Sequence, residues 1–157
     1  MAHQIRKILV AEDFSDSSRH ALEHAEMIAA KFGAAIDLVH VVQDTSAVSS
    51  PSGLVVTPGL LGREEAMEVE ARAQLENEAD ELRSRGLTVK PMVLTGDPLD
   101  CVIQAAKKGK ADLLVVGTHG RTGIAHLLLG SVAESILRHA PCPVLCVRHP
   151  TFQHPGK

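Results

Sequence analysis

The amino-acid sequence predicts an α/β fold: a Rossmann-like open parallel five-stranded sheet of order 3-2-1-4-5, with helices on both faces. Two observations predict it. Short apolar runs alternate with longer amphipathic stretches along the whole chain. Each stretch between two runs is long enough for the helical crossover that parallel strands need. With 157 residues and no internal repeat, the chain is expected to form a single domain over residues 1–157.

Five apolar runs are expected to be the strands. The fourth is a continuous apolar run of the kind that is buried on both faces of a sheet. The third contains Pro91, which cannot donate a ladder hydrogen bond and therefore places this strand at an edge. The expected strands are Lys7–Ala11, Ala35–Val42, Thr88–Leu94, Leu113–Val116 and Val144–Val147.

Four amphipathic stretches are expected to be the helices. Gly33 ends the first, as glycine often does after a helix C-terminus, and Pro98 opens the third at a first-turn position. The expected helices are Ser15–Phe32, Arg63–Arg85, the stretch opened by Asp97-Pro98, and Ser131–His139. Their expected inward positions are Ala21, Leu22, Ala25, Ile28, Ala29 and Phe32 in the first, Met67, Ala71, Leu75, Ala79 and Leu82 in the second, and Leu99, Val102, Ile103 and Ala106 in the third.

Residues 44–62 interrupt the alternation. They are rich in serine, proline and glycine, with two apolar pairs between them. We expect a long surface excursion here, and long loops inside compact domains are often functional.

Composition excludes several classes of function. The aromatic fraction is 2% and the net charge is −3, so neither a stacking platform for single-stranded nucleic acid nor a broad nucleic-acid footprint is expected. No apolar run is long enough to span a membrane, and the N-terminus lacks a signal-peptide layout. Three cysteines do not make a disulfide framework, so a cytoplasmic location is expected.

Polar residues follow the first and fourth strands. Asp13 and Ser15 come after the first, and Gly117, Gly130 and Ser131 belong to a glycine-rich stretch after the fourth. Open parallel sheets bind ligands beyond the carboxyl ends of the strands, at the switch point where the strand order reverses. A strand that ends in a glycine-rich turn and re-enters a helix offers backbone N–H groups to an anion. The sequence therefore predicts a phosphate site facing Asp13.

Structural interpretations compete with this one. The glycine stretch could be a tight strand-to-helix connection, and Asp13 or Ser131 could simply cap a helix. Arg121 either donates a charge-assisted bond to phosphate or is a solvated loop charge, and His119 is a weaker ligand candidate. His40 is expected to be a satisfied, partly buried histidine. The stretch contains no G-x-x-x-x-G-K-[ST] and no G-x-G-x-x-G, which argues against P-loop hydrolysis and a standard dinucleotide site.

The glycine spacing resembles that of a known family. Gly117-x2-Gly120-x9-Gly130-Ser131 is similar to the G-x2-G-x9-G-[ST] pattern of the nucleotide-binding universal stress proteins. The similarity covers nearly the whole chain, including the Gly96-Asp97-Pro98 turn and the strand that follows Pro141-Cys142-Pro143. Position 11 differs, because the family often has proline there and this chain has Ala11.

The resemblance implies ATP at the switch point, with Mg²⁺. Asp13 would lie at the ribose and metal side, and Val41 or Val42 would contact adenine, partly through backbone atoms. The helix N-terminus at Gly130 would receive the phosphates. The complete set of nucleotide-contacting residues implied is Ala11, Asp13, Ser15, Val41, Val42, Gly117, Thr118, His119, Gly120, Arg121, Gly130, Ser131 and Val132. The resemblance also implies a homodimer formed through the last strand, Val144–Arg148.

Three functions are consistent with these residues. The first is an ATP-binding stress-response sensor or adaptor, with no catalytic residue assigned. The second is a slow ATPase or adenylyl-transfer enzyme at the same site, although no general base stands out in the sequence. The third is a dimeric interaction module that binds no nucleotide.

Overall fold

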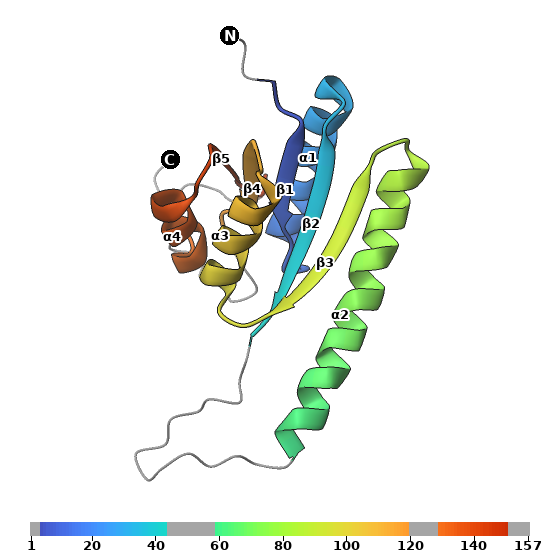
Figure 1. Cartoon of the computed structure of the whole chain (residues 1–157), viewed down its shortest axis with the longest axis vertical. Helices are drawn as coiled ribbons and strands as arrows, with labels where there is room; N and C mark the ends of the chain where they lie inside the picture. Colours follow the sequence, from blue (N-terminus) through green and yellow to red (C-terminus); the bar gives the residue numbers. More distant parts are fainter. Residues whose placement is uncertain (1–3, 44–58, 120–128, 151–157) are drawn as a thin grey trace.

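The computed structural model describes residues 4–43, 59–119 and 129–150, and contains one five-stranded sheet (Figure 1). All neighbouring strands are parallel, and their order is β3-β2-β1-β4-β5, as predicted. The order reverses at β1, which lies between β2 and β4. The strands are β1 (Lys7–Ala11), β2 (Ala35–Val42), β3 (Val89–Thr95), β4 (Leu113–Gly117) and β5 (Val144–Val147).

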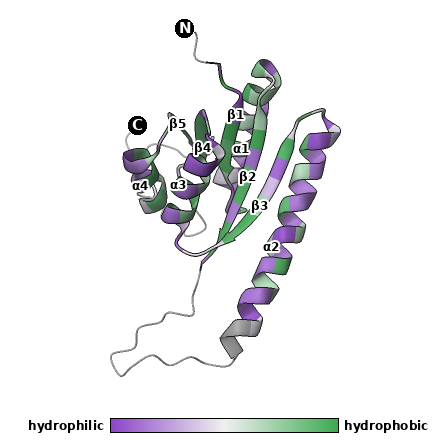
Figure 2. Ribbon diagram, viewed as in Figure 1, coloured by the Kyte–Doolittle hydropathy of each residue, from purple (hydrophilic) through white to green (hydrophobic). Residues whose placement is uncertain are grey.

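Four helices cover the two faces of the sheet. The helices are α1 (Asp16–Phe32), α2 (Gly59–Ser84), α3 (Pro98–Gly109) and α4 (Ser131–His139). α1 and α2 pack on one face in a core that includes Ile8, Val10 and Leu75, whereas α3 and α4 pack on the other face around Leu9 and Leu114. Figure 2 shows the hydrophobic strands enclosed between these more polar helices. Each side of β1 is therefore buried, which holds its carboxyl end firmly between two layers.

The helix ends follow the predicted signals. The Ser15 side chain accepts a hydrogen bond from the Ser18 N–H at the start of α1, and Gly33 ends the helix in the left-handed conformation with φ 67°. Asp97 caps α3 in the same way by accepting from the Asp100 N–H at 3.0 Å, with Pro98 as the first helical residue.

The two edge strands are β3 and β5. Pro91 lies on β3 opposite Leu38 of β2, so the prediction that proline marks an edge strand is confirmed. None of the helices in the described part of the chain is long and apolar enough to cross a membrane.

Three expectations need correction. α2 begins at Gly59 rather than Arg63, so the last residues of the expected 44–62 excursion are helical, and residues 44–58 lie outside the described ranges. Met67 is 40% exposed because the first turns of α2 extend past the end of β3 (Figure 1). Phe32 is 49% exposed because it lies in the last turn of α1, beyond the buried Ala29.

Candidate functional site

The turn after β1 and the segment after β4 contact each other at the switch point. The Ser15 hydroxyl lies 3.4 Å from the His119 carbonyl oxygen, and the His119 N–H donates to the Ser17 hydroxyl at 3.4 Å. These two segments are the ones that the sequence predicted to face each other. Their contact brings Asp13, Ser15 and the residues after β4 to one edge of the sheet.

The turn after β1 has a strained backbone. Phe14 adopts φ 63°, a left-handed conformation that is costly for a bulky residue, and its ring stacks on His40 with centroids 4.4 Å apart. The Asp13 carboxylate accepts from the Ser15 N–H at 3.0 Å and so closes the turn. His40 is buried and its Nδ1 bonds to the Glu12 carbonyl oxygen at 2.8 Å, which confirms the expectation of a satisfied histidine. Strain of this kind is typical of binding sites.

Glu12 is a buried carboxyl group that sequence reasoning missed. Its Oε1 accepts from the Phe14 N–H at 2.7 Å and from the Ser18 hydroxyl, so it holds the turn against α1. Its Oε2 is buried and has no hydrogen-bond partner within the described ranges. Burial raises the pKa of Glu12 to about 7, and the nearby Glu78 adds to the shift. The sequence did contain a signal for this burial. Every second residue of a strand points to the same face, so Glu12 continues the buried row of Ile8 and Val10.

The N-terminus of α4 has no side-chain cap. Gly130 is the N-cap residue, with φ −69° and ψ 153°, and its N–H donates to the Thr118 carbonyl oxygen at 2.7 Å. Ser131 and Val132 follow as exposed residues in the first turn. The first N–H groups of a helix have no partner within the helix and carry the positive end of its dipole. This end of α4 therefore suits an anion.

Gly117, at the end of β4, has a packing role as well as its predicted role in the site. Its φ is not in the left-handed region, so the backbone conformation itself does not demand glycine. A Cβ atom at this position would lie 2.7 Å from both the carbonyl carbon and the hydroxyl oxygen of Ser17. The missing side chain thus allows the start of α1 to approach β4 closely. It also sets the distance between the two segments of the site.

We expect Gly117→Ala to lower the free energy of unfolding by about 2 kcal/mol, because the methyl group overlaps the Ser17 backbone. Urea unfolding measures the effect. Adding Ser17→Ala should not restore stability, since the carbonyl carbon remains in the way. The matched control is Gly62→Ala in α2, where nothing lies within 4 Å of the new methyl group and the change should be neutral or stabilising. Equal effects at the two glycines would contradict this role for Gly117.

The end of β2 distinguishes the two candidate valines. The backbone groups of successive residues in a strand point alternately to its two neighbouring strands. The Val39 carbonyl accepts from the N–H of Glu12, just after β1, whereas the Val42 carbonyl accepts from the N–H of Gly96, just after β3, at 3.0 Å. The backbone of Val41 therefore faces β1, whose pairing has already ended at Ala11 opposite Val39. Val41, rather than Val42, presents its backbone to the switch point.

The remaining predicted residues divide into two groups. Thr118 is buried, its N–H donates to the Val147 carbonyl at 3.0 Å, and its hydroxyl lies 2.9 Å from His119 Nδ1. Gly120 and Arg121 lie outside the described residues.

No group of three or more histidine, cysteine, aspartate or glutamate side chains in the described ranges is placed to hold a metal ion.

Comparison with known proteins agrees with this architecture. The model of the universal stress protein family matches residues 4–148. A universal stress protein of Methanocaldococcus jannaschii is 38% identical over 146 residues, which is 92% of this chain and 83% of the relative. The structure of a universal stress protein, UspA, from Lactobacillus plantarum has a TM-score of 0.82 at 26% identity, covering 92% of this chain and 99% of that one. A universal stress protein solved in complex with cAMP has a TM-score of 0.67 at 30% identity, covering 92% and 97%.

Proposed function

Because the chain belongs to the universal stress protein family, we propose that it binds ATP with Mg²⁺ at the switch point and acts as a cytoplasmic stress-response sensor or adaptor. One observation carries the proposal: the uncapped N-terminus of α4 and the strained turn after β1 both contact the residues that follow β4, because the Gly130 N–H donates to the Thr118 carbonyl and the Ser15 hydroxyl lies 3.4 Å from the His119 carbonyl. The relative solved with cAMP supports an adenine nucleotide as the class of ligand.

The phosphates would bind at the start of α4. Gly130 leaves this position without a side chain, and the N–H groups of Ser131 and Val132 belong to the first helical turn. Backbone donors at a helix N-terminus bind phosphate without a lysine, which agrees with the absence of a Walker motif. Gly120 and Arg121 remain proposed contacts of the same phosphates.

The nucleoside would lie between β1 and β2. Val41 presents backbone groups that can bind the edge of adenine, and Ala11 ends the adjoining strand. Asp13, positioned by its bond to the Ser15 N–H, would supply a carboxylate oxygen to the ribose or to a phosphate-bound Mg²⁺. Glu12 does not compete for this role, because its carboxyl group is directed to Ser18 of α1.

A sensor or adaptor role suits this arrangement better than rapid turnover. In the described part of the site the proposed phosphate-binding groups are backbone donors, and the one carboxyl group whose pKa lies near 7, that of Glu12, is bonded to Ser18 of α1. Nucleotide would contact both the turn after β1 and the segment after β4, so occupancy would change the relative free energies of their conformations. A partner that recognises this edge of the sheet would then distinguish the bound from the free state.

We also propose a homodimer through Val144–Arg148. β5 is an edge strand, and pairing of two such edges would satisfy backbone groups that otherwise face solvent. Light scattering at micromolar concentration should give twice the chain mass of 16.7 kDa. A mass of one chain would reject the dimer.

The test of nucleotide binding starts from the protein as purified. Mass spectrometry of the small molecules released on denaturation should detect ATP or its hydrolysis product. Gly130→Asp protein purified in parallel is the control and should release none. Equal amounts of adenine nucleotide from both proteins would contradict binding at α4.

A further inference from the structure

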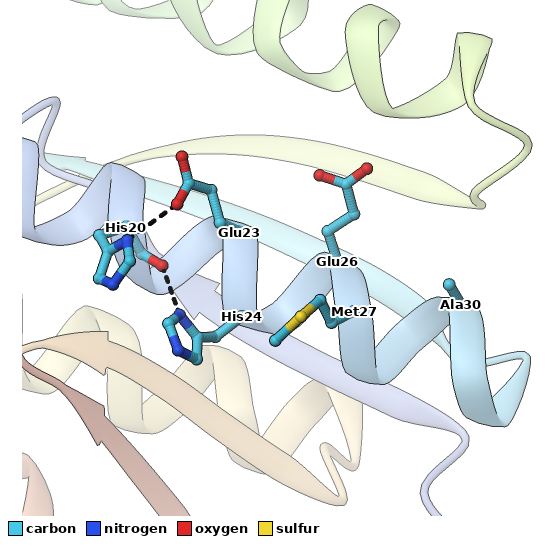
Figure 3. Close-up of a pocket in the computed structure, with 6 residues that line it drawn as sticks. All are labelled: His20, Glu23, His24, Glu26, Met27 and Ala30. Atoms are coloured by element: carbon cyan, nitrogen blue, oxygen red, sulfur yellow. Dashed lines mark hydrogen bonds and ion pairs between the residues drawn. The ribbon is translucent and has the colours of Figure 1, made fainter.

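A pair of histidines lies on α1, after the first helical turn that contacts the segment following β4. His20 and His24 are one helical turn apart, and their rings meet edge to face with centroids 4.7 Å apart (Figure 3). The ring of His149, which follows β5, lies 5.8 Å from that of His20. Both histidines of the pair border a pocket of about 490 Å³, which is lined by His20, Glu23, His24, Glu26, Met27 and Ala30.

Each histidine of the pair is oriented through its Nδ1 atom. His20 Nδ1 lies 2.8 Å from the Glu23 carboxylate, and His24 Nδ1 lies 2.9 Å from the His20 carbonyl oxygen. Carboxylates and carbonyls only accept hydrogen bonds, so each Nδ1 carries the proton. In the neutral imidazole, Nε2 then holds the lone pair. Histidines that bind a metal through one ring nitrogen usually donate the N–H of the other nitrogen to a carboxylate or a carbonyl in this way.

We propose that His20 and His24 bind a divalent transition-metal ion, of which Zn²⁺ is the probe, through their two Nε2 atoms. Histidines at i and i+4 on one helix face are the spacing used by helix-borne zinc sites. Imidazole nitrogen is a preferred ligand of zinc, and Glu23 would orient His20 and balance the charge of the ion. This site is independent of the proposed nucleotide site.

The role proposed for this pair is metal binding. Catalytic zinc ions have three protein ligands and an open position. Within the described ranges, no three ligating side chains are placed around one point. Among the described residues the ion would therefore have two protein ligands, and water would fill the positions that they leave open. Glu23 is engaged with His20 Nδ1, which suits an outer-sphere role.

His139 provides a matched control. It lies on α4, and its Nδ1 contacts the carbonyl of Ser135, four residues earlier, at 2.8 Å, as His24 contacts His20. It is exposed, but no other histidine lies one turn away along α4. Removing it takes away an oriented imidazole without breaking a histidine pair.

The experiment is calorimetric titration of the full, untagged, reduced chain with ZnCl2. We expect saturable binding that His20→Ala and His24→Ala each weaken by about tenfold or more, and that Glu23→Gln weakens by about tenfold. His139→Ala should bind as the wild type does. Imidazole ¹⁵N spectra should show Zn²⁺ shifting Nε2 of His20 and His24. Wild-type affinity in both alanine variants, or an equal loss in His139→Ala, would overturn the proposal; thermal melts show that each variant is folded.

Discussion

Replacing Gly130 with aspartate should abolish ATP binding, with the affinity falling by about 100-fold or more, while the chain stays folded. The new carboxylate would occupy the N-cap position of α4 and interact with the N–H groups that are proposed to bind phosphate. It would also repel the phosphates at a distance where charges interact strongly. Both effects act on the ligand, and neither requires a change in the sheet.

The stability of the Gly130→Asp chain should change by only about 1 kcal/mol. Aspartate is a favoured N-cap residue and interacts well with the positive end of the helix dipole. Against this gain, its Cβ atom would lie 3.1 Å from the Thr118 carbonyl oxygen, so that neighbour must shift slightly. Calorimetric titration with ATP and a thermal melt measure binding and stability separately.

Gly130→Asn is the control that isolates charge. Asparagine has the same shape and also caps helices well, but it does not repel phosphate. We expect it to weaken ATP binding clearly less than aspartate does. If Gly130→Asp binds ATP as tightly as the wild type, the phosphates do not bind at α4.

The second large effect concerns Glu12 and pH. Its pKa is raised to about 7 in the folded chain, against an ordinary value of 4.5, so the folded state holds this proton more tightly than the unfolded state. Its contribution to stability is therefore fully present below pH 4.5 and is lost as pH rises to about 7. The loss amounts to about 3 kcal/mol in the free energy of unfolding.

Glu12→Gln should remove this slope. Glutamine keeps an acceptor oxygen for the Phe14 N–H and the Ser18 hydroxyl but does not ionise. Urea unfolding of both proteins from pH 4.5 to 8, without nucleotide or Mg²⁺, gives the difference in stability, which should move in favour of the variant as pH rises. Titrating groups that do not interact with Glu12 affect both proteins equally and cancel in this difference, whereas the charge of Glu78 is part of the shift that the difference measures. Parallel curves for the two proteins would show that folding leaves the pKa of Glu12 unchanged, which would contradict this account.

The sequence predicted the strands and their order because both depend on simple patterns. Alternation required parallel strands, Pro91 placed β3 at an edge, and the glycine spacing after β4 indicated the family. The switch-point site followed from the order, since ligands of open sheets bind where it reverses.

Other features depend on tertiary contacts that a linear pattern does not contain. The left-handed conformation of Phe14 is held by Glu12 and by stacking on His40, which is distant in sequence. Gly117 resembled a phosphate-loop glycine, whereas its closest neighbour in space is Ser17 of α1. Met67 and Phe32 match the helical period, but each lies toward one end of its helix and is exposed. Gly120 and Arg121 remain predictions from the resemblance alone.

The most direct test of the central claim is calorimetric titration of the wild-type chain, freed of bound small molecules, with ATP in the presence and absence of Mg²⁺. The proposed site predicts saturable binding of one ATP per chain that is tighter with Mg²⁺ and is weakened by Asp13→Ala. Absence of binding under both conditions, with the chain shown to be folded, would contradict the assignment of the switch point as a nucleotide site.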